Sequence, residues 1–190
     1  MSSSIASAPL PRLAPAQRYT GTAMGLHWLL ALLIVGTFSL GVYMSDLPFS
    51  PSRLKYYSWH KWAGVSILLL SMLRLAWRLT HRPPADLAMP AWQATAAHAT
   101  HHLLYALFFI VPLLGWAYSS AAGFPVVWFG LLQLPDFVPV DKALAEAIKP
   151  WHGRAAMLMA ALVLLHVAGA LKHHFIDRDG LLDRMRPGRG

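Results

Sequence analysis

Histidine offers the most chemistry in this chain, and four of its ten histidines lie in long apolar stretches. His27, His60 and His152 each lie near the start of such a stretch, and His166 lies in the last third of the final one. Burying an ionisable side chain among apolar residues is costly, so such a residue usually has a partner and a function. Imidazole binds metal ions and carries protons. Since the chain has no cysteine, thiolate metal sites, iron–sulfur clusters and covalently attached haem are excluded.

The spacing of His152 and His166 predicts that both lie on one face of a helix. Fourteen residues separate them, which at about 100° per residue is a rotation about 40° short of four full turns. The corresponding rise is about 21 Å, so the two side chains approach opposite surfaces of a membrane. Two ligands at this separation suit two haems, one near each surface.

Alternating helix directions give each of these histidines a partner at its own depth. His27 begins the first apolar stretch and matches the depth of His166, whereas His60 begins the second and matches His152. The sequence therefore predicts two pairs of axial haem ligands, His27/His166 and His60/His152. A polar network in a haem-free proton or metal transporter is the alternative for the same four residues.

Arg74 is the other ionisable residue placed well inside an apolar stretch. It follows His60 by fourteen residues, which puts it on the same helical face at the depth of the His27/His166 pair. A haem propionate is a natural partner for a guanidinium at that position. Snorkelling of the side chain to the lipid headgroups is the alternative.

Further histidines fall near the same membrane surface, among them His98, His101 and His173. They are expected near haem propionates or a quinone, or simply at wet helix ends. Ligation of iron by His98, His101 or His102, in place of His27 or His166, is a further alternative.

Basic residues gather near His60 and His152, on the opposite surface; they are Arg53, Lys55, Lys61, Lys149 and Arg154. Such a collar, with Lys61 and Arg154 nearest the two histidines in sequence, attracts small anions such as superoxide electrostatically. Anchoring to lipid headgroups is the alternative for the same residues.

The apolar stretches predict an all-α, integral membrane four-helix bundle. The chain of 190 residues is 56% hydrophobic and 13% charged, against about 25% charged residues in soluble domains. The expected helices cover residues 26–44, 59–79, 96–119 and 151–172, each of about the length that crosses a bilayer. A flexible tail over 1–20, a di-haem domain over 21–176 and a basic tail over 177–190 complete the expectation, with a short interfacial helix at 142–149.

The distribution of charge predicts the orientation and excludes nucleic acid as a partner. The net charge is +8, but the basic residues stand at the ends of the apolar stretches, as anchors to anionic lipid do. With four crossings, both termini lie on one side. Nine Lys and Arg residues fall on that side and six on the other, which predicts cytoplasmic termini.

Several short motifs, in this order and spacing, resemble bacterial cytochrome b561. They are Gly25-Leu26-His27-Trp28, Ser58-Trp59-His60, Pro150-Trp151-His152-Gly153, Leu165-His166 and Leu171-Lys172-His173-His174-Phe175. The resemblance covers about residues 18–187 and implies a four-helix inner-membrane protein with two b-type haems. It also implies that His27, His60, His152 and His166 are the axial ligands.

The resemblance further implies electron transfer with ubiquinone. One activity in similar proteins is oxidation of superoxide with quinone as acceptor, so a superoxide:ubiquinone oxidoreductase or an electron carrier is expected. A cytochrome b subunit that receives electrons from a periplasmic dehydrogenase or hydrogenase is the alternative within the same class.

Overall fold

Four long helices dominate the computed structural model, which describes residues 18–188. The helices are α1 (Gly21–Ser45), α2 (Pro51–Thr80), α3 (Ala91–Ala121) and α4 (Lys142–Lys172). Within the described residues, these four are long and apolar enough to cross a membrane. The chain is therefore an all-α membrane bundle, as the apolar stretches predict. The expected N-terminal tail lies largely outside the described residues.

Two helices, α2 and α4, begin earlier than the apolar stretches because polar caps precede them. The Ser50 side chain accepts a hydrogen bond from the backbone N–H of Arg53, and Pro51 occupies the first turn of α2. Asp141 caps α4 by accepting from the N–H groups of Ala143 and Leu144. The segment 142–149, expected as a separate interfacial helix, is thus the first part of α4, which continues through Pro150.

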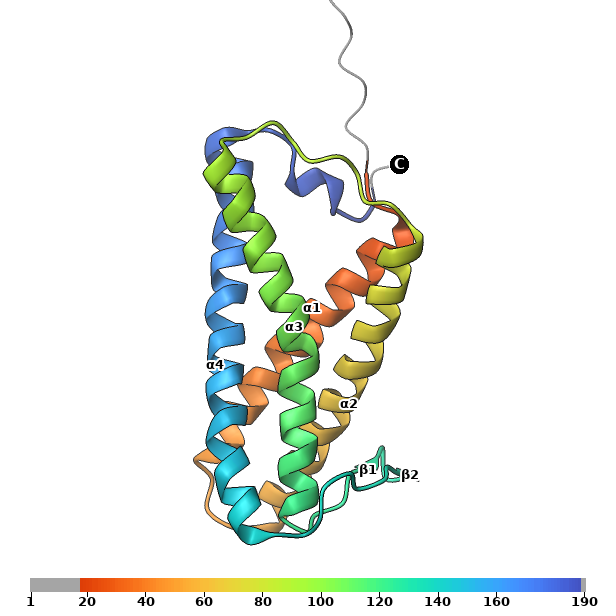
Figure 1. Cartoon of the computed structure of the whole chain (residues 1–190), viewed down its shortest axis with the longest axis vertical. Coiled ribbons are helices and arrows are strands. Elements are labelled where there is room, and N and C mark those ends of the chain that lie inside the picture. Colours follow the sequence, from red (N-terminus) through yellow and green to blue (C-terminus); the bar gives the residue numbers. More distant parts are fainter. Residues whose placement is uncertain (1–17, 189–190) are drawn as a thin grey trace, which may run out of the picture.

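The bundle packs α3 along α4 and α1 along α2, and α1 crosses behind α3 (Figure 1). Its buried core contains Leu30, Ile34, Ile67, Leu104, Leu107, Val111 and Met159. Met159 lies midway along α4 between His152 and His166. The core therefore separates the two histidine levels.

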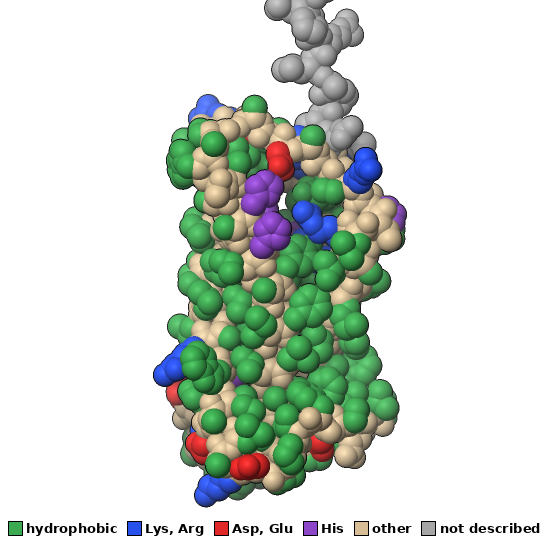
Figure 2. All heavy atoms as spheres, viewed as in Figure 1, with side chains coloured by type: hydrophobic (Ala, Val, Ile, Leu, Met, Phe, Trp, Pro, Cys, Tyr) green, Lys and Arg blue, Asp and Glu red, His purple; other side chains and the backbone are tan. Residues whose placement is uncertain are grey.

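The outer surface suits a hydrocarbon environment. Hydrophobic side chains cover the belt between the two ends, and charged ones gather toward the ends (Figure 2). Large apolar side chains such as Leu32 and Leu164 are more than two-thirds exposed, which is expected for residues that face lipid.

A two-stranded hairpin follows α3 and projects sideways beside α2 (Figure 1). Its strands β1 (Val127–Trp128) and β2 (Leu132–Gln133) pair antiparallel. The indole N–H of Trp62 donates to the carbonyl of Val127 at 2.6 Å, which holds the hairpin against α2. After α4, a π-helix (His173–Asp177) and a 3-10 turn (Leu182–Arg184) lead the chain back across the end of the bundle.

Candidate functional site

The structure brings His60 of α2 and His152 of α4 together. Their ring centroids are 6.1 Å apart, with ring planes at 88°. The Nδ1 atom of His60 lies 3.1 Å from the carbonyl oxygen of Thr37, and that of His152 lies 3.0 Å from the carbonyl oxygen of Val111. A carbonyl oxygen only accepts, so each Nδ1 carries the proton. Each Nε2 is left with a free lone pair, the state in which neutral imidazole binds a metal.

Two glycines make room for these rings. A Cβ atom at Gly41 would lie 3.0 Å from Cε1 of His60, and one at Gly115 would lie 2.9 Å from Cε1 of His152. Cβ contacts under about 3.0 Å do not occur without displacement. The imidazoles therefore lie against bare helix backbone, on α1 and α3 respectively.

A cavity of about 500 Å³ adjoins the two imidazoles. Its walls are mainly apolar and include Val65, Leu68 and Pro112, with open space beside Gly64. The buried indole N–H of Trp116, also in the wall, has no acceptor among residues 18–188. Two free Nε2 atoms, apolar walls and space at a glycine fit a flat, largely apolar cofactor that carries a metal.

The second predicted pair also meets. The rings of His27 on α1 and His166 on α4 are 6.1 Å apart between centroids, with planes at 70°. His101 of α3 joins them, with its ring centroid 5.3 Å from that of His166. Neither His27 nor His166 makes a side-chain hydrogen bond to another group in the described part of the chain, in contrast to the first pair.

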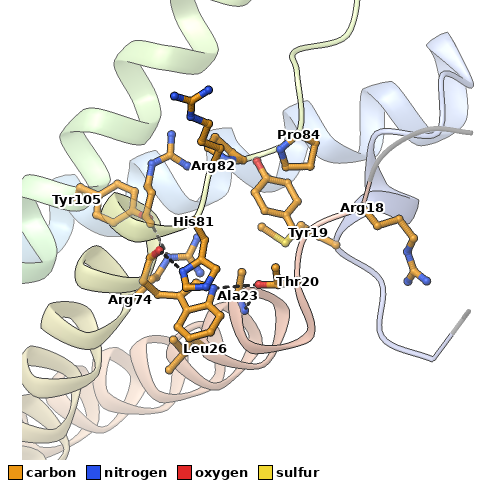
Figure 3. A pocket seen from close by; sticks show the side chains of 14 residues that line it. Arg18, Tyr19, Thr20, Ala23, Leu26, Arg74, His81, Arg82, Pro84 and Tyr105 are labelled. Atoms are coloured by element: carbon orange, nitrogen blue, oxygen red, sulfur yellow. Dashed lines mark hydrogen bonds between the residues drawn. The ribbon is translucent and has the colours of Figure 1, made fainter. Parts of the chain in front are cut away.

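Arg74 turns into the bundle. Its Nε donates to the hydroxyl of Tyr105 at 3.1 Å, and its guanidinium lies 5.7 Å from the centre of that ring. A small pocket lies beside Arg74, between α1, α2 and the segment that connects α2 to α3 (Figure 3). There the guanidiniums of Arg18 and Arg82 point away, whereas Arg74 and Tyr105 converge. Arg74 thus offers an inward cation at the His27/His166 level, and its contact with a propionate stays a prediction.

The remaining predicted residues lie toward the ends of the bundle. His98 is half exposed, and its Nε2 is 3.2 Å from a carboxylate oxygen of Asp86. The Lys61 ammonium, on the cavity wall, donates to Ser119 Oγ and to the carbonyls of Phe124 and Pro125, so it tethers the connection after α3. Arg154 is exposed, with its guanidinium 5.1 Å from the ring centre of Trp151.

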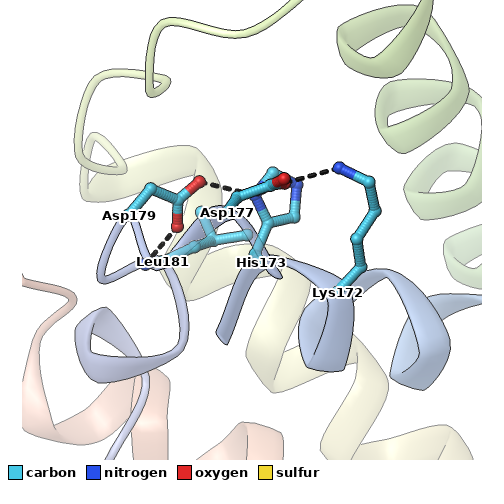
Figure 4. Close-up of polar contacts among 5 residues, drawn as sticks. All are labelled: Lys172, His173, Asp177, Asp179 and Leu181. Carbon is cyan, nitrogen blue, oxygen red and sulfur yellow. Dashed lines mark hydrogen bonds and ion pairs between the residues drawn. The ribbon is translucent and has the colours of Figure 1, made fainter. Parts of the chain in front are cut away.

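His173 faces the C-terminal segment (Figure 4). Its Nδ1 is 2.5 Å from Asp179 and 3.3 Å from Asp177, while Lys172 contacts Asp177. Burial disfavours the charge of Asp179, but the N–H of Leu181 and the His173 imidazole outweigh it and lower the pKa of the carboxyl. Farther on, buried Arg184 donates to the carbonyl of Ala85 at 2.6 Å, so the segment closes over this end.

Gly41 and Gly115 were not predicted from the sequence, although one repeated spacing indicates both. On every helix, two inward positions fourteen residues apart occupy the two levels. The pairs are His27/Gly41 on α1, His60/Arg74 on α2, His101/Gly115 on α3 and His152/His166 on α4. The spacing that led from His60 to Arg74 therefore also leads to both glycines.

Comparison with known proteins adds independent information. A family model described as prokaryotic cytochrome b561 matches residues 18–188. The chain is 32% identical over 177 residues to "Cytochrome b561 homolog 2" of Escherichia coli (strain K12), covering 89% of this chain and 91% of that protein. It is 30% identical over 176 residues to "Probable superoxide oxidase CybB" of Yersinia pestis, covering 90% of this chain and 97% of that protein.

Filling the cavity should remove the cofactor at one level. Gly64→Phe places a ring where the glycine now leaves open space, so haem content should fall while helix content stays unchanged. Gly36→Phe is the matched control, because Gly36 lies exposed on α1 and a Cβ atom added there would have no neighbour within 4 Å. Haem quantified per chain, with circular dichroism, checks both; full haem in folded Gly64→Phe protein would contradict the assignment.

Removing the Asp179 charge should loosen the C-terminal segment. We expect amide hydrogen exchange over residues 178–188 to rise about fivefold in Asp179→Asn, the effect of losing about 1 kcal/mol. Asp183→Asn is the control, since the one ion pair of Asp183 within residues 18–188 is with exposed Arg186 at 3.7 Å. Folding lowers the pKa of the Asp179 carboxyl. Its stabilising contribution to the folded segment is therefore present above the ordinary pKa of 3.8 and is lost as the pH falls below that value. Equal exchange in the two variants would contradict this role.

Proposed function

Since the chain belongs to the prokaryotic cytochrome b561 family of membrane electron-transfer proteins, which implies b-type haem, we propose that it binds two such haems and reduces ubiquinone. The observation that carries this proposal is the presence of two histidine pairs with the same 6.1 Å separation of ring centroids. Metal–imidazole bonds are about 2 Å long, so two imidazoles on opposite sides of one metal have centroids about 6 Å apart. Both pairs have this spacing.

Each residue set then has a defined role. His60 and His152 hold one haem, His27 and His166 hold the other, and the buried core between the levels fixes their separation. Haem bound by these histidines would supply reversible one-electron transfer. Arg74 neutralises a propionate at the second level.

The donor side is the surface nearer His60 and His152. Arg53 and Lys61 line the cavity there, and Lys55 and Arg154 stand on the same surface. We expect these cations to attract superoxide, the substrate class suggested by the name of the Yersinia pestis relative. The balanced reaction takes one electron from each of two superoxide ions, releasing two dioxygen molecules, and converts one quinone and two protons to quinol.

The orientation follows from charge. More Lys and Arg residues fall on the side of the termini, so that side is cytoplasmic in the inner membrane and the donor side faces the periplasm. His98 and His101 lie at the cytoplasmic end, where quinone is reduced in this proposal.

An optical spectrum tests the proposal. The detergent-purified protein should give a low-spin b-type reduced-minus-oxidised spectrum with about two haems per chain. Superoxide should reduce the haem, and added ubiquinone should reoxidise it. One haem would mean that one pair is wrong, and absence of haem in folded, haem-supplied protein would favour the transporter. Reduction only by a protein donor would favour the dehydrogenase-linked subunit.

Charge reversal on the donor surface tests the steering of the anion. Arg154→Glu should slow reduction by superoxide about two- to tenfold and weaken its dependence on salt, because the cation is exposed and screened by ions. Arg82→Glu, an exposed cation on the opposite side, is the control. Stopped-flow rates at several ionic strengths measure both effects. Unchanged rates in Arg154→Glu would show that these cations do not steer the anion. Arg154 is a better test residue than Lys61, because Lys61 also tethers the connection after α3.

A further inference from the structure

Each histidine of the donor-side pair contacts the same structural device, a glycine and a backbone carbonyl of a neighbouring helix. On α1, the ring of His60 lies against Gly41, and its Nδ1–H donates to the carbonyl of Thr37, one turn earlier. Both contacts come from a neighbouring helix. The carbonyl sets which ring nitrogen carries the proton, and the glycine lets the ring approach close enough to reach that carbonyl.

The device is repeated on α3. The ring of His152 lies against Gly115, and its Nδ1–H donates to the carbonyl of Val111, which again stands four residues before the glycine. Two different helices therefore present the same glycine and carbonyl to two different imidazoles. Repetition with the same spacing indicates a shared requirement of the two rings rather than a local accident of packing.

The other level has no such device. The inward positions at that level on α2 and α3 carry Arg74 and His101 in place of glycine. His27 and His166 have no backbone carbonyl within hydrogen-bonding distance of their rings among residues 18–188. The two levels thus pair the same ligand type with different surroundings.

The surroundings of the two levels shift the reduction potential of a bound iron in opposite directions. Donation from Nδ1–H makes the imidazole a more basic ligand, which stabilises the oxidised metal and lowers its reduction potential. A nearby guanidinium such as that of Arg74 stabilises the reduced metal, which carries less positive charge, and raises the potential. Arg53 and Lys61 are the cations that line the donor-side cavity. The Lys61 ammonium already donates to three oxygen atoms, and the Arg53 guanidinium donates to the hydroxyl of Tyr57 at 3.2 Å.

We propose that Gly41 and Gly115 are positioning residues that hold His60 and His152 on backbone carbonyls. They thereby give the donor-side haem the lower reduction potential of the two. The inference rests on the proposed function and deepens it, because electrons then run downhill from the donor side to the side of the termini.

A potentiometric titration of the full-length protein assigns the two potentials. The wild type should titrate in two steps. His60→Leu should lose the step at lower potential, and His166→Leu should lose the step at higher potential. The reverse assignment, or a single shared potential, would overturn the inference while leaving the two-haem function intact. A wild-type protein without haem would instead overturn the proposed electron-transfer function.

Alanine substitution tests the glycines themselves. In Gly115→Ala the added Cβ pushes the His152 ring off its carbonyl, so the lower potential should shift upward and the higher one should stay. Gly41→Ala, with a slightly longer contact, should shift the same step by less, and Gly36→Ala should shift neither. Haem count and helix content verify folding. Two haems with unchanged potentials in both Gly41→Ala and Gly115→Ala would overturn the role of the glycines.

Discussion

An imidazole buried in a membrane must find a partner, and the bundle meets this constraint with a repeated spacing. Each helix presents two inward positions fourteen residues apart, and four antiparallel helices bring these positions together at two depths. One depth collects His60 and His152 with two glycines. The other collects His27 and His166 with Arg74 and His101. The helix lengths and the central core all serve to keep these two levels apart.

The two ends of the bundle are closed in different ways. On the donor side, Lys61 and Trp62 hold the connection after α3 and its hairpin against α2. On the side of the termini, the C-terminal segment crosses over and fastens itself through Arg184 and Met185, the latter accepting from the indole of Trp28. The neighbour of Trp28 is His27, so this closure begins next to one level. Each level is thus enclosed by chain segments far apart in sequence.

Much of this architecture could be predicted from the sequence, because lipid imposes simple rules. Apolar length predicted the four helices. The spacing of His152 and His166, together with the alternating helix directions, predicted which histidines meet. The early starts of α2 and α4 were missed because capping by Ser50 and Asp141 extends helices into polar sequence. Gly41 and Gly115 were missed for a different reason. The role of a glycine in packing is evident only once the side chain that lies against it is known. Contacts across helices, such as His60 to Thr37, follow from the rotation of each helix and not from composition.

We propose that two histidine pairs hold two haems in distinct surroundings. Electron paramagnetic resonance of the oxidised protein tests it most directly, since each low-spin ferric haem gives its own signal. We expect two low-spin signals of equal amount, one lost in His152→Leu and the other in His27→Leu. They should differ in shape, as the ring planes of the two pairs differ, at 88° and 70°. A single signal, or high-spin iron with an open position, would show that the two histidine pairs do not hold two haems.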